Sequence, residues 1–250
     1  MRDFFASYSS STKFYSFGKI HIALILFVII SGFLIYKYRE KLKKFKYKEQ
    51  VRYVMAIILF LNMLIYYIGE AATGMYNWRE DLPFHFCFVT GYAFMFILLT
   101  GNKKLYKIIY FFTFVGPGPA ILWPDLKYTF DTYVFYQFII SHHLMLITSL
   151  YLLFVLDYTV EKKYIGYACI VGHLYIAIMA IFNYFCKTNY VMMKELPSNI
   201  YNLYPFIKYM PPIFWLELVG IAAMFLAYIP ANIMNKNNAK KEKKIELEIA

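Results

Sequence analysis

The stretch from residue 133 to residue 156 reads YVFYQFIISHHLMLITSLYLLFVL and contains no Asp, Glu, Lys or Arg. At about 1.5 Å per residue, a helix of this length crosses the roughly 30 Å of hydrocarbon in a bilayer. A spanning segment must also satisfy its own backbone hydrogen bonds, because lipid offers no partners. The stretch therefore predicts a transmembrane helix.

Similar apolar runs recur along the chain and predict an all-α, polytopic membrane protein, a bundle of about seven transmembrane helices. The composition agrees, since 61% hydrophobic, 22% aromatic and only 16% charged residues is too apolar for a water-soluble domain. The expected spans are residues 19–38, 52–71, 83–100, 105–122, 133–156, 164–186 and 211–230.

The Lys and Arg residues indicate how the bundle is oriented. With the N-terminus outside and the C-terminus in the cytoplasm, 18 of the 26 basic residues lie in cytoplasmic segments, as the positive-inside rule requires. These segments are residues 37–52, 103–107, 162–163 and 236–244. The net charge of +11 then reflects membrane orientation, and no nucleic acid partner is expected.

The chain divides into one transmembrane domain, residues 1–234, and a basic, mixed-charge cytoplasmic tail, residues 235–250. Its bias toward Lys, Ile, Tyr and Phe is typical of an AT-rich bacterial genome, which predicts a multi-pass protein of the bacterial plasma membrane. The sequence indicates no particular oligomeric state.

Polar residues within apolar helices are costly, so their positions point to function. On the expected topology they lie in the outer half of the bundle or near the middle of the membrane, and we expect them to converge on a cavity open to the outer leaflet. Each could instead pair with a neighbouring helix, or be solvated at a helix end. They are His21, Glu70, His85, Cys87, Asp125, His142, His143, His173, Asn183 and Glu217.

Three stretches carry local chemistry. In LPFHFC, residues 82–87, a thiol lies at a predicted helix start, where the helix dipole and an imidazole could make it reactive, or it could be inert and packed. The prolines of GPGP, residues 116–119, predict a broken helix that lines a site or only shapes packing. In Ser141-His142-His143, a mid-membrane imidazole could be a general base, a metal ligand or a packed polar group.

A metal site is the weaker interpretation of these residues. Zinc could take four ligands from three helices, but no HExxH or CxxC spacing supports this, so we expect no cofactor and keep zinc as an alternative. The four candidate ligands are His85, Cys87, His142 and His173.

The order of motifs resembles that of the YwaF-like integral membrane proteins (the TP0381-type family), which are similar to the animal transmembrane protein 164. The likeness covers roughly residues 15–230 and implies a compact helical membrane protein. It rests on FGKIH (17–21), LPFHFC (82–87), PDL (124–126), FIISHHLMLI (138–147) and TNYVMMKELPS (188–198).

For the animal relative, the resemblance implies a phospholipid acyltransferase with a cysteine nucleophile and a histidine. By motif these are Cys87 and His142. Bacterial relatives often have an acidic residue after the cysteine, where this chain has Phe88, so Asp125 or Glu70 would have to orient the imidazole. Other motif positions are occupied by His21, His85, Asp125 and Asn189.

The leading hypothesis is therefore a phospholipid acyltransferase or acyl-hydrolase with a Cys87–His142 pair and a membrane lipid as substrate. One alternative is a zinc-dependent seven-helix lipid hydrolase. Another is a non-enzymatic transporter or lipid-binding protein, in which polar residues would line a path to both sides. The inner halves of the expected spans contain little polarity, which favours a one-sided pocket.

Overall fold

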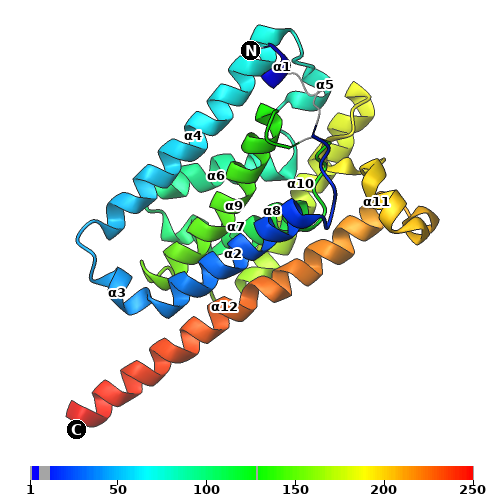
Figure 1. The fold of residues 1–250 in the computed structure, drawn as a ribbon. Coiled ribbons are helices and arrows are strands. Elements are labelled where there is room, and N and C mark those ends of the chain that lie inside the picture. Colours follow the sequence, from blue (N-terminus) through cyan, green and yellow to red (C-terminus); the bar gives the residue numbers. More distant parts are fainter. Residues whose placement is uncertain (1, 6–11, 128, 250) are drawn as a thin grey trace.

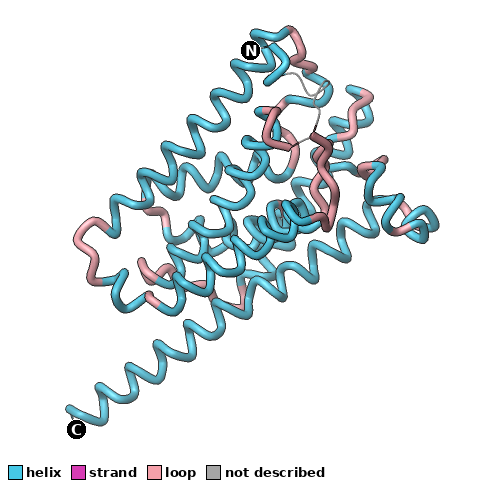
Figure 2. Tube along the Cα trace, in the orientation of Figure 1, coloured by secondary structure: helices cyan, strands magenta, loops and turns pink. Residues whose placement is uncertain are grey.

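The computed structural model describes residues 2–5, 12–127 and 129–249, which consist of helices and connecting loops (Figure 1, Figure 2). The elements are α1 (Arg2–Phe5), α2 (Lys19–Lys37), α3 (Arg39–Lys43), α4 (Lys48–Thr73), α5 (Trp78–Asp81), α6 (Phe86–Thr100), α7 (Lys103–Val115), α8 (Pro117–Leu122), α9 (Tyr133–Phe154), α10 (Tyr164–Cys186), the 3-10 helix η1 (Tyr190–Met192), α11 (Ser198–Leu203), the 3-10 helix η2 (Pro205–Tyr209) and α12 (Pro212–Ile249).

In the part of the chain that the structure describes, six helical segments are long and apolar enough to cross a membrane, so the protein is polytopic. They are α2, α4, α7 together with α8, α9, α10 and the Pro212–Lys244 part of α12. The prediction of about seven full-length spans is therefore corrected. The seventh expected span, residues 83–100, contains the shorter apolar helix α6 of 15 residues.

The short length of α6 has a local cause. Phe84 N–H donates to the Leu82 carbonyl in a tight turn, and His85 is extended, with φ −69° and ψ 142°. The helix therefore begins only at Phe86, although Pro83 suits a first helical turn. At about 1.5 Å per residue, α6 is near 22 Å long, which is less than the thickness of the hydrocarbon core.

The predicted break in the fourth span is present. α7 ends at Val115 and α8 begins at Pro117, with Gly116 between them. Pro117 and Pro119 have no backbone N–H, so two hydrogen bonds of a continuous helix are missing here. The break lies beside the start of α6, because a Cβ on Gly116 would be 3.5 Å from the Cα of Cys87.

α9 is the central helix of the bundle (Figure 1). Within its most apolar stretch, 72% of the residues are buried, against 11% for α2. Helices α2, α4 and α8 pack on it, and α12 packs mainly on α7. Residues 235–249, expected to form a cytoplasmic tail, continue α12 as a helix that extends beyond the bundle (Figure 1).

Two contacts show the relative directions of the central helices. Arg52, near the start of α4, donates to the carbonyls of Leu98 and Leu99 at the end of α6. Tyr151, near the end of α9, donates from its hydroxyl to the Lys48 carbonyl at 2.9 Å. Helix α4 is therefore antiparallel to both α6 and α9, so α6 and α9 run in the same direction.

α1 and the end of α12 lie at opposite ends of the bundle (Figure 1). One end holds α5, the end of α4 and the starts of α6 and α9, and we name it the α5 end. The other holds α3, and we name it the α3 end. The positive-inside rule predicts that the α5 end faces outward and the α3 end faces the cytoplasm.

Candidate functional site

A buried polar network joins α4 to α9 beside His142. Asn62 Nδ2 donates to the Gln137 carbonyl at 3.0 Å and to Ser141 Oγ at 2.8 Å, and Gln137 Nε2 donates to Ser141 Oγ at 3.3 Å. Tyr133 donates from its hydroxyl to the Asn62 carbonyl at 3.0 Å. These bonds fix the rotation of α9 against α4. Asn62 and Gln137 were not among the residues predicted from the sequence, although a side-chain amide inside an apolar run indicates a polar contact between helices.

The imidazole of His142 is held in one tautomer by its own helix. Its Nδ1 lies 2.7 Å from the Phe138 carbonyl oxygen, which can only accept, so Nδ1 carries the proton and Nε2 keeps its lone pair. The ring stacks on that of Phe138 with centroids 4.1 Å apart. His142 is 5% exposed, and no hydrogen bond from a described residue reaches Nε2. An imidazole with this tautomer can accept a proton at Nε2.

Cys87 is the second residue of α6 and carries a free thiol. The thiol lies beside the backbone N–H groups of Cys87 and Phe88, in the positive field of the helix N-terminus. The side chains of Tyr66 on α4 and Tyr175 on α10 are close enough to the Cys87 thiol to interact with it electrostatically. The helix N-terminus favours a thiolate, but burial of the sulfur opposes its ionisation more strongly, so the thiol needs a base to lose its proton.

Helix spacing places Cys87 and His142 at similar depth in α6 and α9. A Cβ on Gly91 of α6 would be 3.6 Å from the Met145 sulfur of α9, so these residues mark where the helices face each other. Cys87 precedes Gly91 by four residues and His142 precedes Met145 by three, and both spacings keep the same helix face. In the described chain, no hydrogen bond joins the Cys87 thiol to His142.

Tyr190 anchors the segment that leads into α6. Its side chain is fully buried, and its hydroxyl donates to the Trp78 carbonyl at 2.6 Å and accepts from the Leu82 N–H at 3.1 Å. Its ring meets that of His85 edge-on, with centroids 5.1 Å apart. Burial lowers the pKa of His85, which favours the neutral imidazole. Tyr190 thus positions the residues just before Cys87.

Asn183, which was expected near a pocket, and Asn189, a motif position, both shape this anchor. Asn183 Oδ1 accepts from the Tyr190 N–H at 2.8 Å and from Thr188 Oγ1 at 2.7 Å, while its Nδ2 donates to the Tyr190 carbonyl at 2.8 Å. Asn189 Nδ2 donates to the Glu195 carbonyl at 2.8 Å. Both amides are occupied by the turn after α10, which explains the TNYVMMKELPS motif as a structural one.

Replacing Tyr190 with phenylalanine is expected to lower the free energy of unfolding by about 0.5–1.5 kcal/mol, because the hydrogen bonds of its hydroxyl to the Leu82 N–H and the Trp78 carbonyl are lost. Unfolding in mixed micelles of SDS and a neutral detergent measures this. Tyr209→Phe is the matched control, because that side chain is 87% exposed. Equal SDS midpoints for Tyr190→Phe and the parent would contradict the anchoring role.

His21 and His143 hold α2 in place. His21 Nδ1 accepts from the Phe17 N–H, and its Nε2 donates to the Ile121 carbonyl, each at 2.7 Å. His143 Nε2 donates to the Leu24 carbonyl of α2 at 3.3 Å, and its buried Nδ1 has no partner among the described residues. Both ring nitrogens of His21 are therefore occupied by hydrogen bonds to the backbone, and neither is free to interact with Cys87.

His173 and Glu217 form a partly exposed pair between α10 and α12. His173 Nε2 lies 2.8 Å from Glu217 Oε2, and its Nδ1 donates to the Cys169 carbonyl at 2.7 Å. The His173 side chain is 56% exposed. The pair joins α10 to α12, so His173 is not a member of the expected convergence.

The five histidines therefore make contacts in different parts of the bundle, whereas we expected them to form a single cluster. In residues 2–5, 12–127 and 129–249, no three His, Cys, Asp or Glu side chains are grouped to hold a metal ion. The alternative zinc set of His85, Cys87, His142 and His173 is thus not assembled.

The carboxylates expected to orient His142 lie elsewhere. Glu70 is 7% exposed, close to Asp81 and Tyr66, and its carboxylate has no hydrogen bond or ion pair to a described residue. Asp125 follows α8 and is exposed beside Lys127. The Phe138 carbonyl, four residues earlier in the same helix, orients the imidazole instead.

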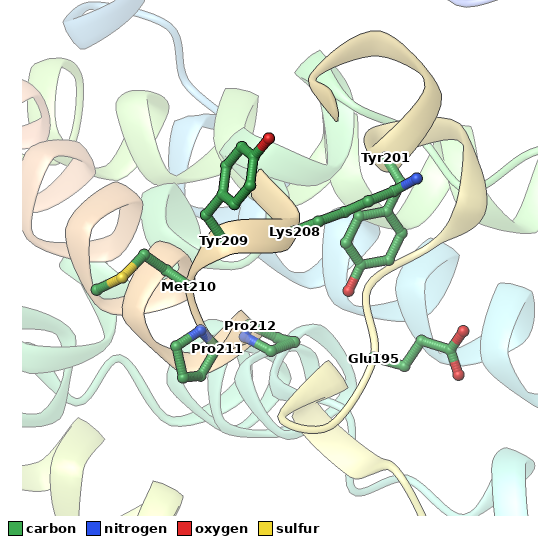
Figure 3. A pocket seen from close by; sticks show the side chains of 7 residues that line it. All are labelled: Glu195, Tyr201, Lys208, Tyr209, Met210, Pro211 and Pro212. Carbon is green, nitrogen blue, oxygen red and sulfur yellow. The ribbon is translucent and has the colours of Figure 1, made fainter. Parts of the chain in front are cut away.

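The open pocket in Figure 3 is separate from this site. It has a volume of about 610 Å³ and lies between the segment before α11, η2 and the start of α12. Neither Cys87 nor His142 lines it. Its lining residues are Glu195, Tyr201, Lys208, Tyr209, Met210, Pro211 and Pro212.

Comparisons with known proteins match nearly the whole bundle. The model of the TMEM164 family matches residues 14–228, a range that includes Cys87 and His142. An uncharacterized protein of Treponema pallidum (strain Nichols) is 25% identical over 231 residues, which cover 90% of this chain and 93% of that protein. No solved structure matches the chain.

Proposed function

The chain belongs to the TMEM164 family, and from this premise we propose that it is a membrane-embedded enzyme that transfers an acyl chain from a phospholipid, with Cys87 as nucleophile and His142 as base. One observation carries the proposal. The Gly91–Met145 proximity and helix spacing support a thiol at a helix N-terminus and an imidazole with a free Nε2 at similar depth in α6 and α9.

The first step forms a thioester. His142 Nε2 takes the proton of the Cys87 thiol as the sulfur attacks the ester carbonyl of the phospholipid. The tetrahedral intermediate collapses and breaks the bond between the carbonyl carbon and the ester oxygen. The leaving lysophospholipid alkoxide takes the proton from the imidazolium, so both charges are neutralised and the acyl chain stays on Cys87.

The second step releases the acyl chain. An acceptor hydroxyl loses its proton to His142 Nε2 and attacks the thioester carbonyl. The carbon–sulfur bond breaks, and the Cys87 sulfur recovers its proton from the imidazolium. A lipid hydroxyl as acceptor gives an acyltransferase, and water gives an acyl-hydrolase. The same two residues therefore support both activities.

Two local features support this chemistry. The backbone N–H groups at the start of α6 lie beside the sulfur, where they can stabilise the negative oxygen of a tetrahedral intermediate. The Phe138 carbonyl keeps the proton on Nδ1 and stabilises the imidazolium when Nε2 is protonated. In this mechanism the Phe138 carbonyl oxygen takes the place of the carboxylate that would otherwise accept the hydrogen bond from His142 Nδ1.

The other two candidate functions receive less support. A zinc hydrolase needs three or more grouped ligands, and the described residues contain no such group. A transport path needs polar residues along its length. The buried polar side chains named above lie mostly toward the α5 end and the middle of the bundle.

Trapping the thioester tests the proposal. Purified protein is incubated with mixed micelles of phosphatidylethanolamine and phosphatidylglycerol that carry radiolabelled acyl chains, then quenched with acid. We expect label on the peptide that contains Cys87, removed by neutral hydroxylamine and missing in Cys87→Ala. Lipid turnover that persists in Cys87→Ala would overturn the proposal. Cys186→Ala, a free cysteine at the end of α10, is the matched control and should keep the label.

A further inference from the structure

A second pocket lies at the α3 end, where α2 turns into α3. It has a volume of about 610 Å³. Its walls combine apolar side chains with two lysines. The lining residues are Leu34, Ile35 and Tyr38 from α2 and the turn, and Lys41, Leu42, Lys44 and Phe45 from α3 and the segment after it.

The surrounding segment has an excess of positive charge. Residues 37–52 contain eight Lys and Arg residues but only two acidic ones, Glu40 and Glu49. Glu49 pairs with Arg52 at 3.2 Å. Lys241 of α12 donates to Glu40 at 2.9 Å, and this hydrogen bond holds the pKa of the Glu40 carboxyl below its usual range. The two carboxylates are therefore already engaged by other cations.

Lys41 and Lys44 are left without an acidic partner. Both are exposed, and neither forms an ion pair with any residue that the structure describes. Lys43, which lies between them in sequence, points to Asp157 instead. Two lysines without an acidic partner among the described residues thus line a pocket whose other walls are mostly apolar.

The position of the pocket relative to the membrane follows from α2. This helix is a membrane span that ends at Lys37, and Leu34 and Ile35 belong to its last turn. The apolar wall therefore lies at the edge of the hydrocarbon, while Lys41 and Lys44 follow it at the depth of lipid headgroups. The apolar wall can accommodate the acyl chain of an acidic lipid, and the two lysines can bind its charged headgroup.

We propose that this pocket binds one anionic phospholipid. Its acyl chain lies against Leu34, Ile35 and Leu42, and its phosphate interacts with the ammonium groups of Lys41 and Lys44. The site is at the opposite end of the bundle from Cys87, so it is a lipid-binding site distinct from the proposed reaction centre. It does not depend on the proposed function.

Binding is tested with purified full-length protein in a neutral detergent. The midpoint of thermal unfolding is followed while dioctanoyl-phosphatidylglycerol is added, which yields an apparent Kd. Dioctanoyl-phosphatidylcholine has the same chains but no net charge, and glycerol 3-phosphate has the phosphate but no chains. We expect stabilisation by phosphatidylglycerol at concentrations where the other two have no effect.

The decisive comparison is between two double variants. Lys41→Gln/Lys44→Gln is expected to weaken phosphatidylglycerol binding about 30-fold, because each lysine near an acidic headgroup contributes a factor of roughly five. Lys104→Gln/Lys162→Gln removes the same charge from two exposed lysines that do not line the pocket, and it should change the Kd less than about twofold.

Three results would overturn the proposal. Equal weakening by both double variants would mean that the lipid responds only to overall charge. Binding of phosphatidylcholine with the same Kd as phosphatidylglycerol would mean that the lysines do not distinguish the two headgroups. Binding of glycerol 3-phosphate at the same concentration as the lipid would indicate a phosphate site without an acyl chain. All four lysines are exposed, so each variant is expected to unfold at the parent's midpoint without lipid.

Discussion

Replacing Cys87 with alanine is expected to slow phospholipid acyl transfer at least about a thousandfold. The sulfur is the group that bonds to the acyl carbon, and alanine at this position offers no nucleophile. The measurement is the rate of lysophospholipid release by purified protein in micelles. The matched control is Cys186→Ala, which removes another free thiol near the α5 end and should leave the rate within about twofold.

The Cys87→Ala variant must remain folded for its loss of activity to be informative. Cys87 lies against the backbone of Gly116, so loss of activity must be separated from loss of packing. Alanine is smaller than cysteine and keeps the helix start, and the variant should unfold near the parent's midpoint. A folded Cys87→Ala protein that releases lysophospholipid at the parent rate would exclude thioester chemistry at this residue.

Replacing His142 with alanine is expected to lower the same rate by roughly 10²–10⁴-fold, the usual contribution of a positioned general base. The loss should shrink as the pH rises, because hydroxide can then remove the thiol proton in place of Nε2. Rates measured at several pH values between 6 and 10 test both the size of the loss and its dependence on pH. A purely structural role for His142 would give a loss that does not vary with pH.

The neighbouring histidine provides the control. His143→Gln keeps a side-chain N–H that can donate to the Leu24 carbonyl, and His143 touches no proposed reacting group. Its rate should stay within a few-fold of the parent at every pH. If His143→Gln loses activity as strongly as His142→Ala and with the same pH dependence, the base has been assigned to the wrong imidazole.

Hydropathy and proline placement predicted much of the architecture. Apolar runs without charge require membrane helices, and six of the seven expected spans contain helices long enough to cross. The prolines of residues 116–119 predicted the α7–α8 break. The exception is α6, which begins at Phe86 because the residues from Leu82 to His85 form a turn. That turn depends on Tyr190, which lies more than a hundred residues away in sequence.

The candidate site was predicted only in part. The motifs singled out Cys87 and His142, and their pairing stays a prediction. The expected clustering of all five histidines was wrong for His173, which is exposed and pairs with Glu217 of α12. Depth along a helix can be counted in a sequence, but the direction in which a side chain points around the helix axis cannot.

For this chain, linear order and composition were sufficient for the membrane class, the approximate spans and the residue types capable of chemistry, because hydrophobic length and local backbone geometry are properties of short segments. Helix rotation and partner choice came from packing. The Asn62–Ser141 bond and the Gly91–Met145 contact set which faces of α4, α6 and α9 meet. Such contacts join residues from separate helices, so they exist only once the bundle has formed.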